Sequence, residues 1–382
     1  MKAAIRIMIG LALFWMCSSK GILILSAADV DDTTKDSLEK FEFEEIDEEL
    51  KELFPEERLD FQETLMGILS GDLSFTADLA KRLVMDQLSY AYTSSKESLV
   101  HILFLAVIAA VFHNFGNIFK SRQISETGFY ILYLLLIALC LNAFGNVVEW
   151  AAGGIESLVS FMKVFCPIYF LAVTAAGGSI TATAFYSLVL FLIFVVELLI
   201  VSIILPAVHV GMMIKILNFL SEEDYLSKFA GLIETFVSWT LKTLLACVAG
   251  LNIMQGLISP AIDSVKNSVV TRGMEAVPVI GDALGGTAEI VLGTAVLVKN
   301  GIGVAGAVIC FALCIYPLVQ TGCIVLMYKL AAAILQPVSD KRIIGCIESV
   351  SDGCRLLMRV IFTTGLLFLF TIVIVSAVMQ KG

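Results

Sequence analysis

The stretch LVLFLIFVVELLIVSIILP, Leu188 to Pro206, decides the fold class of this chain. It is long enough to cross a bilayer as one helix, because a span needs about 20 apolar residues. Its single charged residue is Glu197. A charge at the bilayer centre costs about 2.5–3.5 kcal/mol on insertion scales, so we expect Glu197 to face protein or water, or to be protonated. It is a candidate for a relay or cavity-lining group, with a polar contact between helices as the alternative.

The composition extends this interpretation to the whole chain. Of the 382 residues, 58% are hydrophobic and 16% are charged, whereas a soluble domain is about half apolar and about a quarter charged. We therefore predict an all-α, polytopic helical membrane protein whose transmembrane domain covers 97–382. A Gly-rich, membrane-associated loop, 259–300, interrupts it. By length we expect about eight transmembrane helices, over 98–119, 128–148, 157–177, 180–205, 229–258, 301–317, 319–336 and 356–379.

The N-terminus has the pattern of a signal peptide over 1–28. Lys2 and Arg6 precede an apolar run, and SAA precedes Asp29, which suits cleavage after Ala28. A second apolar patch, GILIL, leaves an uncleaved anchor as the alternative. Residues 29–96 would then form a soluble leader outside the cytoplasm.

The leader is strongly acidic. The net charge of the chain is −10, and Asp29 to Asp60 holds fifteen Asp or Glu residues against four Lys or Arg. We expect this run to be partly disordered, because like charges repel. It also argues against nucleic-acid binding, which needs a basic face. The apolar spacing that begins at Phe61 and Leu65 predicts two amphipathic helices, which pack on each other, lie on the membrane or dock a partner.

Basic residues in short loops set the expected orientation. Loop 120–127 contains Lys120 and Arg122, and loop 337–355 is also basic, so both should be cytoplasmic. This favours two crossings over 301–336, as a tight hairpin near Pro317. A single long span is the alternative, and it would put the second basic loop outside. With the hairpin, loop 259–300 is cytoplasmic, on the side opposite the leader, where a partner ATPase could reach it.

Four charged residues inside apolar runs are candidates for intramembrane function: Glu197, Lys163, Glu234 and Lys242. A cross-helix pair of Glu197 with Lys163 or Lys242 is one interpretation. Lysines near span ends can also extend their ammonium group to the interface, which suits Lys163 better than Lys242.

Prolines and glycines mark expected helix breaks and close helix contacts. A proline removes a helix hydrogen bond, which hydrocarbon cannot replace, so broken helices occur where protein or water covers them. Glycines let helices approach closely. The candidates for these roles are Pro167, Pro278, Gly285, Gly286, Gly301, Gly303, Gly306 and Pro317.

The stretch KNGIGVAGAV, Lys299 to Val308, matches the dinucleotide fingerprint G-x-G-x-x-G. A dinucleotide site needs a βαβ unit and an acidic residue about 20 residues further on, whereas the next acidic residue after Gly306 is Asp340. We therefore expect no nucleotide and no cofactor, and read these glycines as packing positions. Neither metal-ligand spacing nor a hydrolase or Walker motif is present, so we expect no enzyme activity and no metal.

Two stretches, EAVPVIGDALGG (275–286) and GTAVLVKNGIGVAG (293–306), resemble the stage III sporulation protein AE family of endospore-forming Firmicutes. The resemblance covers nearly the whole chain. It implies a subunit of the secretion-like channel complex between mother cell and forespore, located in the outer forespore membrane. It also implies partners from the same complex, including an ATPase, and no known catalytic residues. The alternative is a secondary transporter or permease that feeds the forespore.

Overall fold

The computed structural model describes residues 43–53, 60–69, 85, 89, 91–93, 95–97, 99–111, 122–176, 179–219, 224–274 and 281–378. Within these ranges the regular structure is helical and contains no strand, which confirms the all-α class. The predicted signal peptide 1–28 and Pro278 lie outside the described residues, as does most of the second predicted amphipathic helix.

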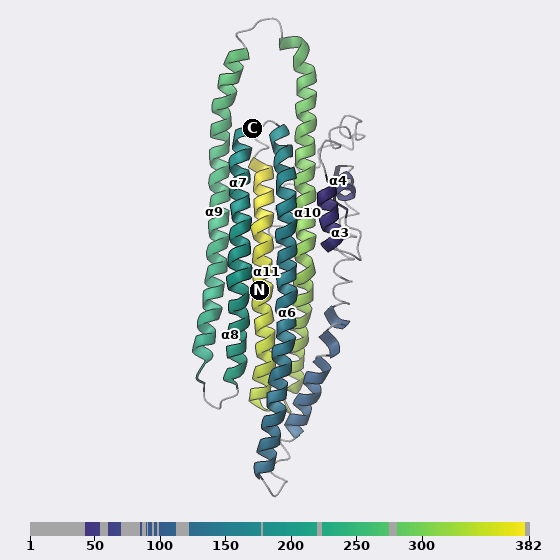
Figure 1. Cartoon of the computed structure of the whole chain (residues 1–382), viewed down its shortest axis with the longest axis vertical. Helices are drawn as coiled ribbons and strands as arrows, with labels where there is room; N and C mark the ends of the chain where they lie inside the picture. The colour runs from purple at the N-terminus through teal and green to yellow at the C-terminus, as the bar shows by residue number, and fades with distance from the viewer. Residues whose placement is uncertain are drawn as a thin grey trace.

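The described helices form a bundle of long helices that run alternately up and down, with two short helices on one flank (Figure 1). The short helices are α3 (Glu44–Leu53) and α4 (Phe61–Leu69). The bundle consists of a helix at Ala91–Val111, α6 (Arg122–Ala175), α7 (Ser179–Val196), the π-helix η1 (Glu197–Ile204), α8 (Leu205–Asn218), α9 (Ser227–Met274), α10 (Gly281–Leu335) and α11 (Lys341–Val378).

Six helices in the described part of the chain are long and apolar enough to cross a membrane. The prediction of about eight differs because two pairs of expected spans are each one continuous helix. Segments 128–148 and 157–177 belong to α6, which has 54 residues, and segments 301–317 and 319–336 belong to α10, which has 55 residues. Each is about 80 Å long at 1.5 Å per residue, far more than the roughly 30 Å of hydrocarbon.

The predicted breaks at proline are wrong at two sites. Pro167 lies inside α6, and Pro317 lies inside α10, so the hairpin expected near Pro317 does not form. A proline costs the helix one hydrogen bond, but it leaves the turns on either side intact. Packing of the long apolar helix against its neighbours keeps its direction on both sides of the proline. The hairpin near Pro317 was expected only because it would put loop 337–355 on the same side of the membrane as loop 120–127. The continuous helices also put the described residues of these two loops at one end of the bundle.

The continuous helices also change where the Gly-rich segment lies. Residues 259–274 belong to α9 and 281–300 to α10, so most of the predicted loop is helix. Because α9 runs upwards in Figure 1 and α10 downwards, they are joined at the end of the bundle that carries α3 and α4. The expectation that 259–300 lies opposite the leader is therefore wrong. Lys341 and Arg342 still lie at the same end as Arg122, as the charge rule requires.

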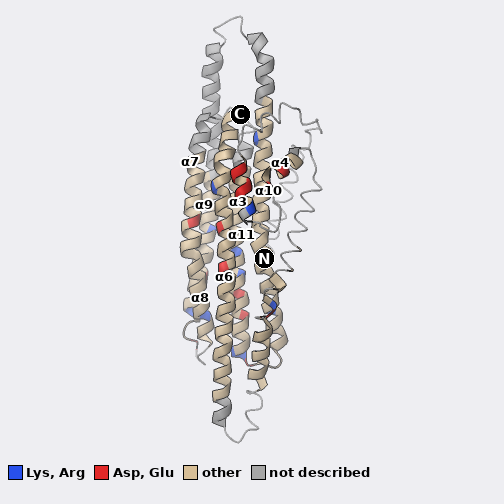
Figure 2. Cartoon of the chain, turned by 45° about the vertical axis from the view of Figure 1, so that its right-hand side comes forward, with Lys and Arg blue, Asp and Glu red and all other residues tan. Residues whose placement is uncertain are grey.

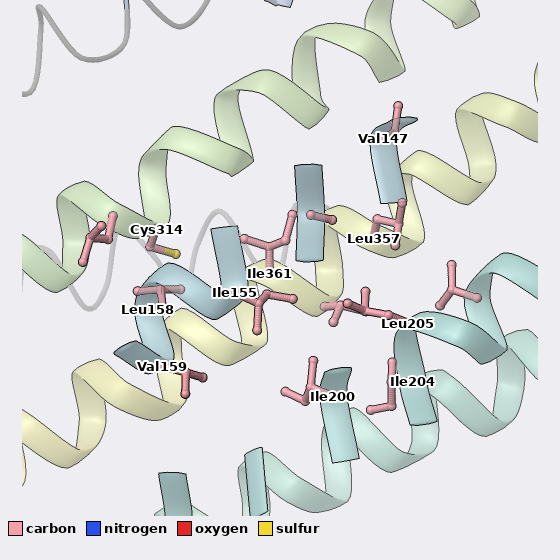
Figure 3. Close-up of a cluster of buried hydrophobic side chains, with 14 of the residues drawn as sticks. Val147, Ile155, Leu158, Val159, Ile200, Ile204, Leu205, Cys314, Leu357 and Ile361 are labelled. Carbon is pink, nitrogen blue, oxygen red and sulfur yellow. The ribbon is translucent and has the colours of Figure 1, made fainter. Parts of the chain in front are cut away.

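The core of the bundle lies where α6, η1, α10 and α11 meet. Figure 3 shows Ile155 and Leu158 of α6 beside Leu357 and Ile361 of α11, with Ile200 of η1 close by, and all five are buried. Small residues bring the helices close together in this region, and a Cβ added at Gly365 of α11 would collide with the Cys314 side chain of α10. Dispersion contacts between closely packed helices stabilise such a bundle in lipid, where burial itself contributes little.

The lower end of the bundle is held by polar contacts. Lys215 of α8 pairs with Asp352 of α11 at 3.0 Å. The Tyr133 hydroxyl of α6 donates a hydrogen bond to the Phe219 carbonyl at 2.8 Å. The Arg342 guanidinium lies over the Phe129 ring, 5.3 Å from its centroid. The first contact joins α8 to α11, and the other two join α6 to the end of α8 and to the start of α11.

Two buried thiols offer a direct test of this arrangement. Cys140 of α6 and Cys346 of α11 are both buried, and their thiols lie next to each other. Mild oxidation of isolated membranes is therefore expected to join Cys140 to Cys346, because sulfurs in contact need little movement to reach disulfide geometry. Peptide mass spectrometry under non-reducing conditions measures this. Cys247, exposed on α9, is the control and should not pair with Cys140; a Cys140–Cys247 disulfide would contradict the fold.

Candidate functional site

An ion pair joins two helices in the upper half of the bundle. The Lys163 ammonium of α6 lies 2.9 Å from a carboxylate oxygen of Glu197, the first residue of η1. Of the two pairings considered for Glu197, the structure contains the one with Lys163. The side chains are 49% and 44% exposed, so the pair lies on the surface of the bundle rather than inside it.

The π-helical segment that begins at Glu197 has a local cause. Pro206 follows directly after Leu205, at the start of α8, and has no N–H to donate. The backbone before it shifts register, and the Leu205 N–H donates to the Ile200 carbonyl five residues earlier. A π segment inside a longer helix often marks a functional site, because the extra residue changes the direction of side chains. Here the segment starts at Glu197, the one charged residue of the stretch Leu188 to Pro206.

Glu234 and Lys242 lie on a different helix, away from this pair. Both are exposed on α9. Within the described part of the chain neither forms an ion pair, and the structure does not bring Lys242 to Glu197. Neighbouring α9 residues are also exposed, including Trp239 at 66%. The outer face of α9 is therefore mixed, with charged and aromatic groups side by side.

Gly306 of α10 leaves room for a large side chain of α6. A Cβ added at this glycine would collide with the ring of Phe165. That ring stacks between Phe161 and Tyr169, at centroid distances of 5.4 Å and 5.3 Å. Of the glycines singled out in the sequence, Gly301 and Gly303 are buried in the same helix. The residues of the fingerprint-like stretch thus form a packing surface of a helix, and the residues before it, 294–298, are helical too, where a dinucleotide site would need a strand.

A second close approach involves Pro317. Its side chain lies 2.7 Å from where a Cβ on Gly154 of α6 would stand, so the glycine makes room for the proline ring. Pro317 is thus a packing residue of α10 rather than a break. Gly285 and Gly286 lie near the start of α10, where only the backbone is described.

The leader is docked on the membrane domain. Phe61 of α4 is fully buried, and its ring lies 5.4 Å from Phe43 and 6.1 Å from Phe165 of α6. The acidic run, expected to be partly disordered, contains the helix α3, whose Ile46 and Leu50 are buried. Of the two amphipathic helices predicted from the sequence, the first is α4, which packs against α10 and against α3, while α3 packs against α6. The second lies mostly outside the described residues, so the arrangement of the two relative to each other stays a prediction.

One buried carboxylate holds the two leader helices in register. The Phe61 N–H donates to Asp47 Oδ1 at 2.6 Å, which satisfies both an orphan amide at the start of α4 and the carboxylate of α3. Burial raises the pKa of Asp47, and the hydrogen bond from Phe61 opposes the shift. Asp60 caps α4 by accepting from the Glu63 N–H at 3.0 Å.

Sequence reasoning missed Lys299. It is absent from the candidate intramembrane charges drawn from the sequence, but its side chain is among the most buried in the described chain, at 1% exposure. It lies about two turns before Gly306 on α10, the helix against which α4 packs. A buried ammonium has to be satisfied by polar groups. The available signal was an isolated lysine in the apolar stretch TAVLVKNGIGVAG.

The candidate residues that the structure brings together, Lys163 and Glu197, form a polar contact between two helices. In the described ranges no group of three His, Cys, Asp or Glu side chains could hold a metal ion. The Lys163–Glu197 pair combines a strong donor with an acceptor, but no described hydroxyl or thiol is hydrogen-bonded to either group. The pair links α6 to η1 as a charge-assisted contact between two helices.

Comparisons with known proteins identify the family of this chain. The sequence profile named Stage III sporulation protein AE matches residues 59–379, which include α4 and the whole helical bundle. The chain is 24% identical over 314 residues to the Stage III sporulation protein AE of Bacillus subtilis (strain 168), covering 82% of this chain and 78% of that protein. No solved structure matches the chain. The profile covers far more than half of the sequence, and so this chain belongs to the stage III sporulation protein AE family.

Proposed function

We propose that this chain is an integral membrane subunit of the sporulation-specific, secretion-like channel complex, located in the mother-cell (outer forespore) membrane, where it supports forespore development after engulfment. Its partners are the other subunits of that complex, including an ATPase. The leader lies outside the cytoplasm, between the two membranes, and the ends of the bundle at 219–226 and 336–340 lie in the cytoplasm.

The observation that carries this proposal is the family match across the entire bundle, residues 59–379. Two structural features support it. The helices α6 and α10 are each about 80 Å long, so they extend well past a bilayer on at least one side and offer surfaces to soluble partners. The docked leader helix α3 presents a row of exposed acidic side chains, Glu44, Glu45 and Glu48, next to the membrane domain.

Deletion of the gene in the sporulating organism that encodes it tests the role. We expect normal vegetative growth, complete engulfment and a large loss of heat-resistant spores. A fluorescent fusion of the full chain should encircle the engulfed forespore when it is made in the mother cell. Normal spore yield in the deletion strain, or a requirement for expression in the forespore, would overturn the proposal.

The alternative, a secondary transporter, makes a different use of Glu197. For a structural pair we expect Glu197→Lys to lower spore yield by at least about tenfold through loss of the assembled subunit, because two ammonium groups would then face each other across α6 and η1 at a cost of more than about 1.4 kcal/mol. The reversed pair Lys163→Glu with Glu197→Lys should restore both assembly and spores. Spore counts and immunoblots of membranes measure the two effects.

The matched control is Glu348→Lys, at an exposed position of α11 with no ion pair among the described residues, and it should leave both readouts unchanged. If Glu197 instead took part in transport by a secondary transporter, the variants would give a different result. In that case the reversed pair would restore the assembled subunit but not the spores, and Glu197→Gln would abolish spore formation with the subunit intact. This pattern would replace the structural role of Glu197 by transport.

A further inference from the structure

The outer face of α6 changes character halfway along the helix. Near its lower end the exposed residues are apolar, including Ile131 and Leu134. Between residues 139 and 170, by contrast, all exposed residues are polar, charged or glycine; we call this set the α6 stripe, and it consists of Asn142, Asn146, Glu149, Gly153, Glu156 and Lys163. Their spacing alternates between three and four residues up to Glu156, and Lys163 follows seven residues later, which places them on one face. The stripe is about 32 Å long, close to the thickness of a bilayer core.

At the same level, another side of the bundle is apolar. The Phe144 ring of α6 lies 6.0 Å from the His209 ring of α8, and Lys163 pairs with Glu197, so α6 from 144 to 163 runs beside 209 to 197. The large exposed residues on that side are Leu190, Phe191, Phe194, Leu198, Ile203, Val210, Met213 and Leu217. Figure 2 shows charged residues along the described bundle among mostly uncharged ones.

The two faces cannot both meet the same surroundings. In water, the α7–α8 face would expose a large apolar patch, which marks a membrane or protein contact. In lipid, Glu149 and Glu156 of the α6 stripe would each cost about 2.5–3.5 kcal/mol, and neither has an ion pair among the described residues. The conflict disappears if the α7–α8 face meets lipid and the α6 stripe is covered by polar groups of another protein at that depth.

The outer face of α9 supplies matching groups at the matching depth. A Cβ on Gly211 of α8 would lie 2.8 Å from the Ile233 side chain, so Ile233 is level with Gly211, two residues beyond His209. Both α6 and α9 run upwards in Figure 1. Lys242 therefore lies roughly 10 Å above the level of Phe144.

On the same scale, Glu149 and Glu156 lie about 8 Å and 18 Å above Phe144. The ammonium of Lys242 is thus at a level between the two carboxylates of the α6 stripe. Glu234, level with Phe144 to within a turn, lies at the depth of the amide side chains of Asn142 and Asn146. Helices α6 and α9 are on different sides of the bundle: α9 packs against α8 and α11 and lies at the left edge in Figure 1.

We propose that the α6 stripe is the docking surface for α9 of a second copy of this chain. Lys242 of one copy lies between Glu149 and Glu156 of the next, and Glu234 accepts from the amides of Asn142 and Asn146. Copies in one membrane share one orientation, so the levels found within a chain also hold between chains. The contact is heterologous, and it repeats to a ring or a row of copies. The proposal does not depend on the role in sporulation.

A cysteine pair tests the contact in membranes that contain the full chain. Gly153→Cys places a thiol on the stripe, where an added Cβ meets nothing within 4 Å. Ala246→Cys places one on α9, one turn above Lys242 at an exposed position; Cys247→Ala removes the native exposed thiol. Mild oxidation of this variant is expected to give disulfide-linked dimers and larger species. Gly153→Cys with Phe191→Cys, on the apolar face, is the matched control and should stay monomeric.

Charge reversal tests the electrostatic match. In the Gly153→Cys, Ala246→Cys background, Lys242→Glu is expected to reduce cross-linking at least about tenfold, which corresponds to about 1.4 kcal/mol. Adding Glu149→Lys and Glu156→Lys should restore it, which a folding defect would not do. Unchanged cross-linking with Lys242→Glu overturns the proposal. So does disulfide formation by Gly153→Cys alone, which would mean that two stripes face each other. Fast reaction of that thiol with an impermeant maleimide and no disulfide to α9 would instead show that the stripe lines water.

Discussion

Replacement of Phe165 by alanine is expected to lower the free energy of unfolding by about 3–5 kcal/mol, the usual cost of removing a fully buried aromatic ring. Phe165 is fully buried and lies at the point where α6, α10 and the leader meet. Its ring stacks on Phe161 and Tyr169, contacts Phe61, and covers Gly306. Unfolding of the purified chain in mixed micelles, followed by circular dichroism, measures the change.

The control for this substitution is Phe191→Ala. Phe191 is 62% exposed on α7, and its loss should change stability by no more than about 0.5 kcal/mol. A second, sharper check uses Gly306→Val. Alone it should destabilise the chain by about 1–3 kcal/mol, because its side chain collides with the Phe165 ring. Combined with Phe165→Ala it should cost less than the sum, because the valine fills the space left by the ring. Additive effects would contradict the contact.

Phe61→Asp is expected to release the leader from the membrane domain. The substitution puts an unpaired carboxylate into a fully buried site beside Asp47, at a cost of about 3–5 kcal/mol. This shifts the balance between docked and undocked leader by about a hundredfold or more. Limited proteolysis of sealed membranes, probed with antibodies against the leader and against the C-terminal helix, measures the release.

Glu48→Ala serves as the control, because Glu48 is exposed on α3 and should not change protease sensitivity. The C-terminal fragment of the Phe61→Asp chain should stay intact, since α10 and α11 pack together without the leader. Protection of the leader equal to that of the unchanged chain would show that Phe61 does not anchor it. General degradation of both ends would show that the leader is needed for the fold of the whole bundle.

Local sequence pattern was sufficient for the class of the protein and for its family. Blocks of apolar residues predicted helices in a membrane, and stretches such as GTAVLVKNGIGVAG indicated the family that the profile match confirmed. As the one charged residue of Leu188 to Pro206, Glu197 is also a candidate from sequence alone, whereas the choice of Lys163 over Lys242 as its partner is not. Periodicity also placed α4 correctly, because Phe61 and Leu65 lie on the face that is buried.

The number and direction of the helices were decided by tertiary packing. Pro317 reads as a break from sequence, because nothing local shows that Gly154 of α6 makes room for its ring. The same holds for Lys299, because nothing in its local sequence shows that its side chain is buried. A rule based on a span of about 20 residues counts apolar blocks, whereas a helix continues wherever neighbouring helices cover it.

The sequence alone determined that this chain is a helical membrane protein of the sporulation family, because hydrophobicity and motif are local properties. Only the tertiary structure decided that Lys163 pairs with Glu197, that the leader docks on Phe165, and that α10 is one helix. Each of these depends on contacts between residues distant in sequence. Such contacts are set by which helix faces fit together, and a pattern along one helix does not contain the shape of its neighbour.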